Sequence, residues 1–458
     1  MKQSKPEFFP YIYHTVKTLP ILSEQERITC LELAGNNLNN LRPHEITFDL
    51  LTDSGNSSRS IEQFSSIYVA DEGPFRISET AKKLERLLIE VFGFPFVDLY
   101  PQGRSAEQAF SSLMVKPGQV IPGNMTYTTT QHHQQMNGGK PVSVVCEEAF
   151  HLDSAVVFKG NVDLSKLSAL IAEEGDNIAY VNIELCSNSI GGYPISMENL
   201  EKVYKLTSSH NILLILDSTR ILENAKFIQE FEDGFKNESI SSIIKQICNL
   251  SDGCVKSLKK DFLTSNGGYI GVRDAGLYSR LRDYSLVSGT DISATDLATI
   301  YQGIKEAVYL EEHMGSRFSL TKRLFDQLKE NGVPLVEPSS CHGVWIRVQP
   351  FVQHLSEMKS PQVSLQNALY LKGGIRSGSA TLRKPDGELI PILRLALPHR
   401  LYNESQIDYI AYAVTAVWNE REKLIDYEVV EGSKGLLEQM VAHYRSFPTE
   451  KNQVNESK

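Results

Sequence analysis

Short apolar segments that alternate with amphipathic helices are the feature that most constrains how this chain can fold. The segments predicted as strands are 96–99, 142–146, 178–185, 212–216 and 269–272. Helices are predicted between or beside them at 78–92, 106–113, 197–208, 240–250 and 275–284. Strands that are apolar along their length are buried on both faces, and intervening helices allow parallel pairing. The pattern predicts an α/β fold with a mostly parallel sheet covered by helices.

The pattern changes towards the C-terminus, after a long helical stretch predicted at 294–331. Later strand candidates at 343–348 and 390–397 are amphipathic, and helices are expected beside them at 365–371 and 405–425. A helix is also expected at 24–34 and a strand at 48–51. We expect the following division: an N-terminal arm at 1–18, a large domain at 58–310, a smaller α+β domain from 19–57 and 311–447, and a disordered tail at 448–458.

Composition and charge exclude several classes of protein. The 458 residues carry a net charge of −10, from 46 basic and 56 acidic side chains, and no basic stretch stands out to neutralise nucleic-acid phosphates. No apolar run approaches the roughly 18 residues of a membrane span, and we expect no signal peptide. The six cysteines are scattered without paired spacing, which is typical of reduced thiols in a cytoplasmic protein.

A lysine near a glycine-rich turn is the first candidate for chemistry. The stretch 254–261 runs from an apolar segment into Lys259 and Lys260, and Gly267 and Gly268 follow. A lysine in such a place can hold an aldehyde cofactor as a Schiff base, and the cationic neighbour Lys259 favours the neutral amine that this requires. A Lys-Lys pair alone is more often a solvated surface pair. The assignment therefore depends on the rest of the chain.

Two polar residues follow predicted strands, where ligands of open α/β sheets bind. Asp217 ends the strand at 212–216, and a carboxylate there could keep a pyridinium nitrogen protonated. The alternative is a plain helix N-cap. Asn188 lies in the stretch 187–192 and could donate to a phenolic oxygen of the same ring. Its alternative is a glycine-rich turn.

Further candidates would complete a pyridoxal phosphate (PLP) site. Gln102-Gly103-Arg104 at a predicted helix start is suited to an anion such as a phosphate, to which Ser257 could add a hydroxyl; helix capping is the alternative for each. Tyr127 could stack on the ring or be a core tyrosine. Arg394 is a charge inside an apolar strand, so it needs an anionic partner, either a substrate carboxylate or a structural ion pair.

These segments together resemble the β-eliminating lyases, the tryptophanase and tyrosine phenol-lyase family of fold-type-I PLP enzymes. They occur in the order of that family from about residue 45 to 400. The matching segments are 49–55, 71–72, 102–104, 158–161, 187–189, 191–192, 217–218, Arg220, 223–225, Ser257, 259–261, 267–268 and Arg394.

The resemblance implies a role for each matching residue around the cofactor. Lys260, with Lys259 beside it, would form the Schiff base and move the α-proton of the substrate. Asp217 would hold the ring nitrogen, while Asn188 and Arg220 would contact the phenolic oxygen. The residues that would hold the phosphate are Gln102, Gly103, Arg104 and Ser257, and Tyr127 stands where the family has a stacking phenylalanine.

The resemblance also implies a substrate site, a cation site and an assembly. Arg394, with Thr52, Ser54 and Asn188, would bind the amino-acid substrate. Glu72 and the carbonyl of Gly55 match positions that bind a monovalent cation, usually K⁺. Such enzymes are homotetramers, so we expect a homodimer or homotetramer whose N-terminal arm packs on another subunit.

The chain departs from the family where an aromatic leaving group would bind. Gly73-Pro74-Phe75 offers no hydroxyl where the family has a proton-donating tyrosine, and Thr128 replaces the acidic residue of tryptophanases. The segment after Arg376 is shortened and lacks the phenol-recognising arginine. Gln439 stands where the family has a histidine or phenylalanine. Proton transfer to a carbon leaving group needs a positioned acid, so slow release of indole or phenol is expected.

The sequence therefore predicts a PLP-dependent lyase that removes the α-proton of an amino acid and eliminates a β-substituent other than indole or phenol. The alternatives are other PLP chemistry on the same scaffold, either transamination or β- or γ-replacement. A minor alternative is an inactive structural paralogue.

Overall fold

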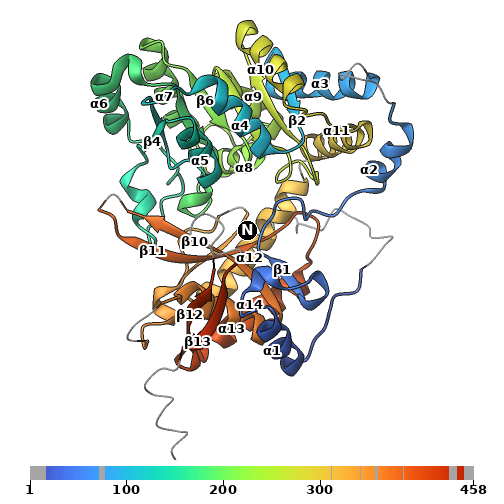
Figure 1. Ribbon diagram of the computed structural model, residues 1–458, viewed down its shortest axis with the longest axis vertical. Helices are drawn as coiled ribbons and strands as arrows, with labels where there is room; N and C mark the ends of the chain where they lie inside the picture. The colour runs from blue at the N-terminus through green and yellow to red at the C-terminus, as the bar shows by residue number, and fades with distance from the viewer. Residues whose placement is uncertain are drawn as a thin grey trace, which may run out of the picture. The chain divides into compact units, whose positions relative to one another are not determined.

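The computed structural model describes residues 17–71, 78–310, 312–340, 342–355, 359–384, 386–432 and 441–447 (Figure 1). The chain divides into two compact units. Unit 1 is built from the described parts of Met1–Asp53, Phe318–Pro398 and Tyr402–Lys458, and unit 2 from those of Ser54–Arg317 and His399–Leu401. Nearly all of the expected arm at 1–18 and the whole tail at 448–458 lie outside the described residues.

Unit 2 is organised around a seven-stranded sheet of order β2-β8-β7-β6-β5-β3-β4. Strand β8 runs antiparallel to both of its neighbours, and the other pairs are parallel. This confirms the predicted mostly parallel sheet of an α/β fold. The strands are β2 (Phe96–Tyr100), β3 (Val120–Gly123), β4 (Lys140–Ser143), β5 (Val181–Glu184), β6 (Leu214–Asp217), β7 (Gly253–Ser257) and β8 (Gly268–Val272).

Helices surround this sheet, as the upper part of Figure 1 shows. In α9, Ile240, Ile243, Ile244 and Ile247 recur at helical spacing and all are buried. The helices of unit 2 are α2 (Ile61–Ser66), α3 (Glu79–Phe92), α4 (Gly103–Met114), α5 (Thr128–Met136), α6 (Leu164–Glu174), α7 (Met197–Ser209), α8 (Ile221–Phe231), α9 (Ile240–Asn249), α10 (Ala275–Val287) and α11 (Ala294–Tyr309).

Unit 1 is a smaller α+β unit with its own core. Its four-stranded sheet has the order β1-β10-β11-β9, and β12 pairs with β13 in a second sheet. Buried apolar residues of α13, α14 and the larger sheet form one cluster. The elements are α1 (Glu24–Leu33), β1 (Phe48–Leu50), β9 (Gly343–Arg347), α13 (Pro361–Gly373), β10 (Ile375–Arg383), β11 (Leu389–Ala396), α14 (Glu404–Asn419), β12 (Asp426–Glu431) and β13 (His443–Phe447).

Some expected elements differ in their bounds. The helical stretch predicted at 294–331 consists of two helices, α11 and α12 (Glu312–Glu330). At Leu310 the backbone leaves the helical region, with φ −110° and ψ 79°. Helix α14 ends at Asn419, earlier than expected, and a short 3₁₀ turn then leads into β12. Ser377 to Thr381, expected as a shortened loop, belongs to strand β10.

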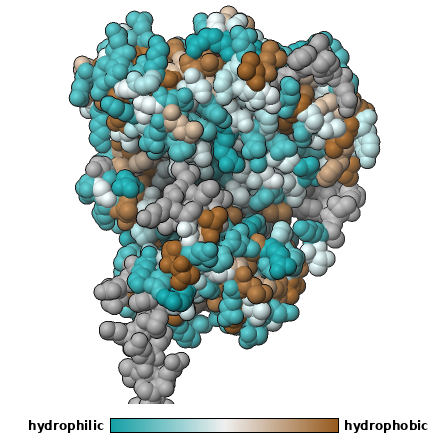
Figure 2. All heavy atoms as spheres, in the orientation of Figure 1, coloured by the Kyte–Doolittle hydropathy of each residue, from teal (hydrophilic) through white to brown (hydrophobic). Residues whose placement is uncertain are grey.

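The surface mixes polar and apolar side chains, as the visible face in Figure 2 shows. Among the residues described, no helix is both long and apolar enough to cross a membrane. The five cysteines in the described ranges are free thiols.

Candidate active site

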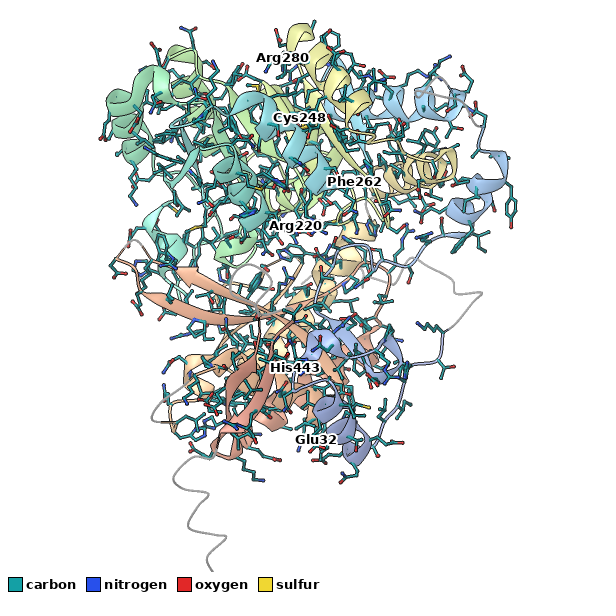
Figure 3. The ribbon with its side chains drawn as sticks, viewed as in Figure 1. Glu32, Arg220, Cys248, Phe262, Arg280 and His443 are labelled. Atoms are coloured by element: carbon teal, nitrogen blue, oxygen red, sulfur yellow. The ribbon has the colours of Figure 1, made fainter. Side chains whose placement is uncertain are left out.

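The candidate site in unit 2 lies where its central strands end. Strands β5, β6 and β7 are parallel neighbours, so their carboxyl ends meet at one edge of the sheet. Asn188 follows β5, Asp217 ends β6, and Ser257 ends β7. Arg220, which follows β6, is labelled at this edge in Figure 3. The topology therefore gathers these predicted residues from separate parts of the sequence.

The residues predicted to bind the phosphate lie in close contact with one another. Gly103 begins α4, and a Cβ atom there would lie 2.5 Å from Cβ of Ser257. A Cβ atom on Gly268 would lie 2.6 Å from the carbonyl carbon of Gln102. Glycine is thus needed at both places to bring the start of a helix against the end of β7 and the beginning of β8. Amides at a helix start and the Ser257 hydroxyl make a fitting cradle for a phosphate.

Asp217 does not cap a helix, so the alternative read from the sequence is wrong. Helix α8 begins at Ile221 and its N-cap residue is Arg220. Asp217 is only 7% exposed, and its Oδ1 accepts a hydrogen bond of 3.0 Å from the backbone N–H of Thr219. A buried carboxylate at a strand end fits a partner such as a protonated ring nitrogen.

Asn188 and Tyr127 occupy turns at the ends of two further strands. Asn188 is 8% exposed and begins a 3₁₀ turn that ends at Gly191, which has φ 103°. The glycine-rich turn is therefore present together with the buried amide. Tyr127 precedes the first turn of α5 and is half-buried, unlike a core tyrosine.

Three lysines lie close together in the sequence, within β7 and in the turn that follows it. The structure places them in different surroundings. Lys256 is 1% exposed, donates to the carbonyl oxygen of Ser218, and lies 4.1 Å from the ring centroid of Phe262. Burial is the main cause that lowers the pKa of Lys256 to about 8. Its amine is therefore enclosed by the fold, and this residue suits a structural role.

Lys259 and Lys260 are only half-buried, in the turn that follows β7. The charge of Lys260 acts on two carboxyl groups, Glu107 and Glu184, which also feel the charge of Asp217. Burial, followed by the positive charge of Arg104, lowers the pKa of Lys259. The amine of Lys260 is thus electrostatically linked to the same acidic groups as Asp217.

Gly55 touches this lysine turn directly. Its backbone N–H donates to the carbonyl oxygen of Lys259 at 2.8 Å. Gly55 has φ 76°, and a Cβ atom there would lie 3.0 Å from Cε of Lys259. The left-handed backbone and the close approach both favour glycine. Gly55 is therefore placed where it can influence the position of the lysine turn.

Two acidic residues of this edge were missed from the sequence. Glu107 in α4 accepts a hydrogen bond of 2.8 Å from the hydroxyl of Thr129. Burial, and then the charge of Asp217, raise the pKa of Glu107 to about 7. Glu184, the last residue of β5, is 3% exposed, and the same two causes raise its pKa to about 8. The strand-end rule that identified Asp217 missed Glu184, because the strand was predicted to reach residue 185 and β5 ends at Glu184.

A buried cluster near this region has the residue types of a metal site but not the charge balance. Single ligand atoms of Glu223, Asp261 and His399 lie within 4.8 Å of one another. However, Nη1 of Arg317 lies 2.9 Å from Oε1 of Glu223 and also hydrogen-bonds with Nε2 of His399. Nε of Arg220 lies 3.7 Å from the other Glu223 oxygen. Two guanidinium groups therefore provide the positive charge that a metal ion would bring.

In unit 1, Arg394 occupies the middle of β11, half-buried, opposite Gly378 and Trp345. Its Nη2 donates to the carbonyl oxygen of Leu51 at 2.8 Å, immediately before Thr52. The Gly378 position leaves room beside the guanidinium, since a Cβ there would lie 3.4 Å from it. The structure therefore brings the start of the Thr52 segment and Arg394 together within unit 1.

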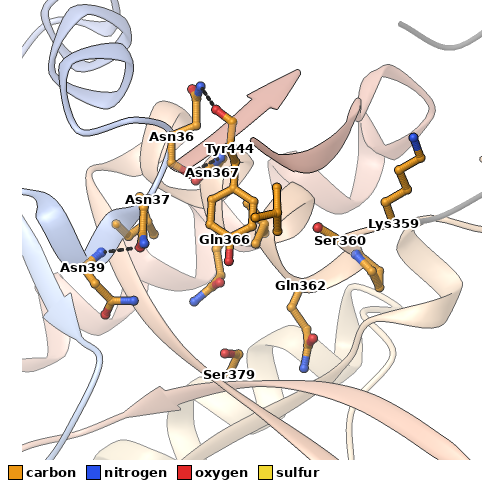
Figure 4. A pocket seen from close by; sticks show the side chains of 14 residues that line it. Asn36, Asn37, Asn39, Lys359, Ser360, Gln362, Gln366, Asn367, Ser379 and Tyr444 are labelled. Atoms are coloured by element: carbon orange, nitrogen blue, oxygen red, sulfur yellow. Dashed lines mark hydrogen bonds between the residues drawn. The ribbon is translucent and has the colours of Figure 1, made fainter. Parts of the chain in front are cut away.

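A separate pocket in unit 1 has a volume of about 260 Å³ (Figure 4). Many of its carboxamides are already tied to backbone carbonyl oxygens. Nδ2 of Asn36 donates to Tyr444, Nε2 of Gln366 to Ser377, and Nε2 of Gln362 to Ala380. These bonds join the end of α1, α13 and the strands beside them. We therefore assign a structural role to the side chains that line this pocket, because they hold these elements together.

Several residues expected at the site lie outside the described residues. These are Glu72, Gly73, Pro74, Phe75 and Gln439. Thr128 is described, and it is the first residue of α5 and exposed.

Comparison with known proteins gives a family match over most of the chain. Residues 49–422 match the profile of the family described as "Beta-eliminating lyase". The tyrosine phenol-lyase of Clostridium tetani is 35% identical over 442 residues, covering 93% of this chain and 95% of that protein. The tyrosine phenol-lyase of Symbiobacterium thermophilum is 34% identical over 435 residues, covering 92% and 94%.

Solved structures share the fold at low sequence identity. The serine palmitoyltransferase of Sphingomonas wittichii has a TM-score of 0.59 and 15% identity, covering 82% of this chain and 88% of that chain. A serine palmitoyltransferase variant from S. paucimobilis with a bound PLP–myriocin aldimine has a TM-score of 0.59 and 14% identity, with the same coverage of both chains. An aromatic aminotransferase from Pyrococcus horikoshii has a TM-score of 0.59 and 14% identity, covering 87% of this chain and 100% of that chain. The predicted fold-type-I class is thereby confirmed.

Proposed function

Because this chain belongs to the β-eliminating lyase family of PLP-dependent lyases, we propose that it eliminates a heteroatom group, rather than phenol or indole, from the β-carbon of an amino acid. The PLP ring supplies an electron sink for loss of the α-proton. The overall reaction of a β-substituted alanine with water yields pyruvate, ammonia and the protonated leaving group.

The residues at the sheet edge of unit 2 fit the cofactor group by group. Gly103, Gln102, Arg104 and Ser257 would hold the phosphate, and the close approach of Gly103 to Ser257 supports this. Asp217 would hold the ring nitrogen, Asn188 and Arg220 the phenolic oxygen, and Tyr127 would stack on the ring. Lys260 would hold the aldehyde and move the α-proton, with Lys259 beside it.

Arg394 would bind the carboxylate of the substrate, together with Thr52, Ser54 and Asn188. The guanidinium is held in place by the Leu51 carbonyl oxygen, and the glycine at 378 leaves its neighbourhood open. A planar guanidinium can accept a carboxylate in bidentate fashion. Its anchoring supports a substrate that carries a free α-carboxylate.

The observation that supports the choice of leaving group is the small size of the two β10 residues nearest to Arg394 along one face, while Arg376 on that face is already bound to Asp49. The strand places Gly378 opposite Arg394, and Ala380 two residues further on the same face. Neither side chain can recognise a phenol hydroxyl or protonate an aromatic carbon. A thiolate or halide leaves without protonation at carbon, so it does not need such an acid.

Product analysis tests the proposal. We expect release of pyruvate and ammonia from S-alkylcysteines or β-chloroalanine with a kcat/KM at least about 100-fold above that for tyrosine or tryptophan, as expected when a general acid is missing. Steady formation of phenol or indole at comparable rates would contradict the choice of leaving group. Amino-group transfer to a keto acid without release of the β-substituent would indicate transamination, and a protein that binds no PLP would be an inactive paralogue.

We also propose a monovalent cation site at the carbonyl of Gly55 and at Glu72, of which Glu72 lies outside the described residues. The hydrogen bond from Gly55 to Lys259 supports this cation site. A cation that orders Gly55 would also order the turn that carries Lys259 and Lys260. Replacing K⁺ by a tetraalkylammonium ion should lower PLP affinity. Equal affinity in both salts would rule the site out.

Finally, we propose that the protein is a homodimer or homotetramer. An exposed apolar stretch along α2 and the 3₁₀ turn after it supports this. Ile61 is 60% exposed, Phe64 53%, Tyr68 90% and Val69 81%. Clustered apolar surface of this kind is typical of interaction sites. A second copy of this chain is the partner that we propose.

A further inference from the structure

Two carboxyl side chains lie side by side on one face of the sheet, at the ends of β5 and β6. Glu184 and Asp217 are register partners in a parallel pair, and the N–H of Leu185 donates to the carbonyl oxygen of Asp217 at 3.0 Å. Register partners point to the same face of a sheet, on strands about 4.8 Å apart. Both residues are buried, at 3% and 7% exposure. The two acids therefore share a small space with little water.

The carboxyl group of Glu184 is bonded at one oxygen. Its Oε1 accepts the backbone N–H of Asn188 at 2.8 Å. Its Oε2 is buried and has no hydrogen-bond partner within the described part of the chain. Asn124 fixes the backbone on the other side, since it accepts from the N–H of Glu184 at 2.8 Å and donates to its carbonyl oxygen at 3.1 Å. The position of Oε2 is thus imposed by the fold.

The charges around Glu184 favour its neutral form. Burial and then the negative charge of Asp217 raise the pKa of Glu184 to about 8. The Asn188 N–H bond and the positive charges of Arg220 and Lys260 oppose this rise without cancelling it. Glu107, the other acid that feels Asp217, has a pKa raised to about 7. A neutral carboxylic acid has one O–H to donate, and Asp217 offers a carboxylate acceptor at the paired position of the neighbouring strand.

We propose that Glu184 is a positioning residue that donates a hydrogen bond from Oε2 to the Asp217 carboxylate while its Oε1 holds Asn188. One side chain then fixes two of the groups that would bind the PLP ring. This inference rests on the ring-binding roles proposed above for Asp217 and Asn188.

Substitutions that keep or remove the donor test this role through cofactor affinity. Glu184→Gln keeps a donor and an acceptor, whereas Glu184→Leu removes both at similar volume. Measured by absorbance titration near neutral pH, PLP affinity should fall about 10-fold or more in E184L, the usual effect of losing a hydrogen bond to a charged group. E184Q should restore it to within about 3-fold of the unaltered protein. Equal weakening in both variants, or in neither, would overturn the proposal.

The pH dependence of the stability of the apo protein tests whether Glu184 is protonated when the cofactor is not bound. A carboxyl whose pKa is raised on folding binds its proton more tightly in the folded state, so stability falls as pH rises from 4.5 through about 8. Glutamine cannot ionise. The Tm of apo E184Q relative to the unaltered protein should therefore increase between roughly pH 5 and pH 9. Glu173→Gln, at an exposed position of α6, is the control and should show no such trend. A constant difference for E184Q would contradict a buried proton on Glu184.

Asp217→Asn separates failure of this inference from failure of the proposed function. With residue 217 uncharged, the pH-dependent effect of E184Q on the apo protein should become smaller but persist, because the negative charge of Asp217 is gone while the burial of residue 184 remains. If D217N leaves PLP affinity and the visible spectrum of the bound cofactor unchanged, the proposed ring-binding role of Asp217 fails. The apo measurements still decide whether Glu184 and Asp217 form a pair.

Discussion

At the scale of single residues, the site depends on side chains whose neighbours come from other strands. Gly103 shows this most directly, since the atom it lacks would overlap Ser257. Its conformation does not require glycine by itself, because only residues with φ between about +20° and +160° are strained by a side chain. The close approach of α4 to β7 is the reason for glycine at this position.

Gly103→Ala should therefore weaken binding of the cofactor's phosphate. The added Cβ would lie 2.5 Å from Cβ of Ser257, so the helix start must shift away from β7. We expect PLP affinity to fall at least about 10-fold, by loss of charge-assisted hydrogen bonds, while affinity for pyridoxal changes much less. Gly276→Ala at the start of α10 is the control, because its Cβ would meet only Oδ1 of Asp274, at 3.3 Å. Equal losses for PLP and pyridoxal would argue against a phosphate cradle.

The sequence was sufficient to predict Asp217 but not Glu184 or the role of Lys256. A polar residue directly after an apolar strand is visible in the sequence, and Asp217 is such a residue. Glu184 was placed inside a strand predicted to reach 185, whereas β5 ends at Glu184. Its importance comes from register pairing with Asp217, and strand register is a tertiary property. The enclosure of Lys256 by Phe262 is likewise tertiary.

At the scale of elements, amphipathic periodicity identified most helices but not where each one ends. Helices α11 and α12 were predicted as one helical stretch without a break, because the sequence around Leu310 contains no glycine or proline. Strand β10 was missed because Ser377-Gly378-Ser379-Ala380 has low strand propensity. It is stabilised by pairing with β1 and β11, which sequence periodicity does not show.

Two helical glycines of unit 2 should respond to alanine in opposite directions. In α11, a Cβ on Gly303 would lie 2.6 Å from the carbonyl oxygen of Phe262. This oxygen belongs to the backbone, so it cannot easily move away. Gly303→Ala should lower the free energy of unfolding by about 1–3 kcal/mol. In α12, a Cβ on Gly315 would meet nothing within 4 Å. Gly315→Ala should raise that free energy by about 0.5–1 kcal/mol. Urea unfolding of the apo protein measures both, and effects of the same sign would contradict the packing of α11.

At the scale of the whole molecule, the groups proposed for chemistry are divided between the two units. The proposed cofactor residues belong to unit 2, while Arg394 and Thr52 belong to unit 1. The α/β class and the smaller α+β unit could be predicted from the change in strand pattern. The strand order and the reversed direction of β8 could not, because they depend on which strands pair.

The proposed oligomer can be tested on the apolar stretch at α2, where Figure 2 shows brown side chains along the edge that Figure 1 labels α2. Val69 is 81% exposed, and Val69→Glu should shift the protein to a smaller species by placing a charge in an apolar contact. Val287→Glu is the control, since Val287 is 90% exposed on α10. Light scattering after size-exclusion chromatography gives the masses. An unchanged mass for V69E would place the interface elsewhere.

The central claim is that Lys260 holds PLP at the sheet edge beside Asp217. The most direct measurement is borohydride reduction of the PLP-loaded protein, followed by proteolysis and mass spectrometry to locate the modified lysine. Lys256 and Lys259 are internal controls within the same short segment. We predict a pyridoxyl group on Lys260 and none after Lys260→Ala. Modification of Lys256 or Lys259 instead, or of no lysine, would contradict the account.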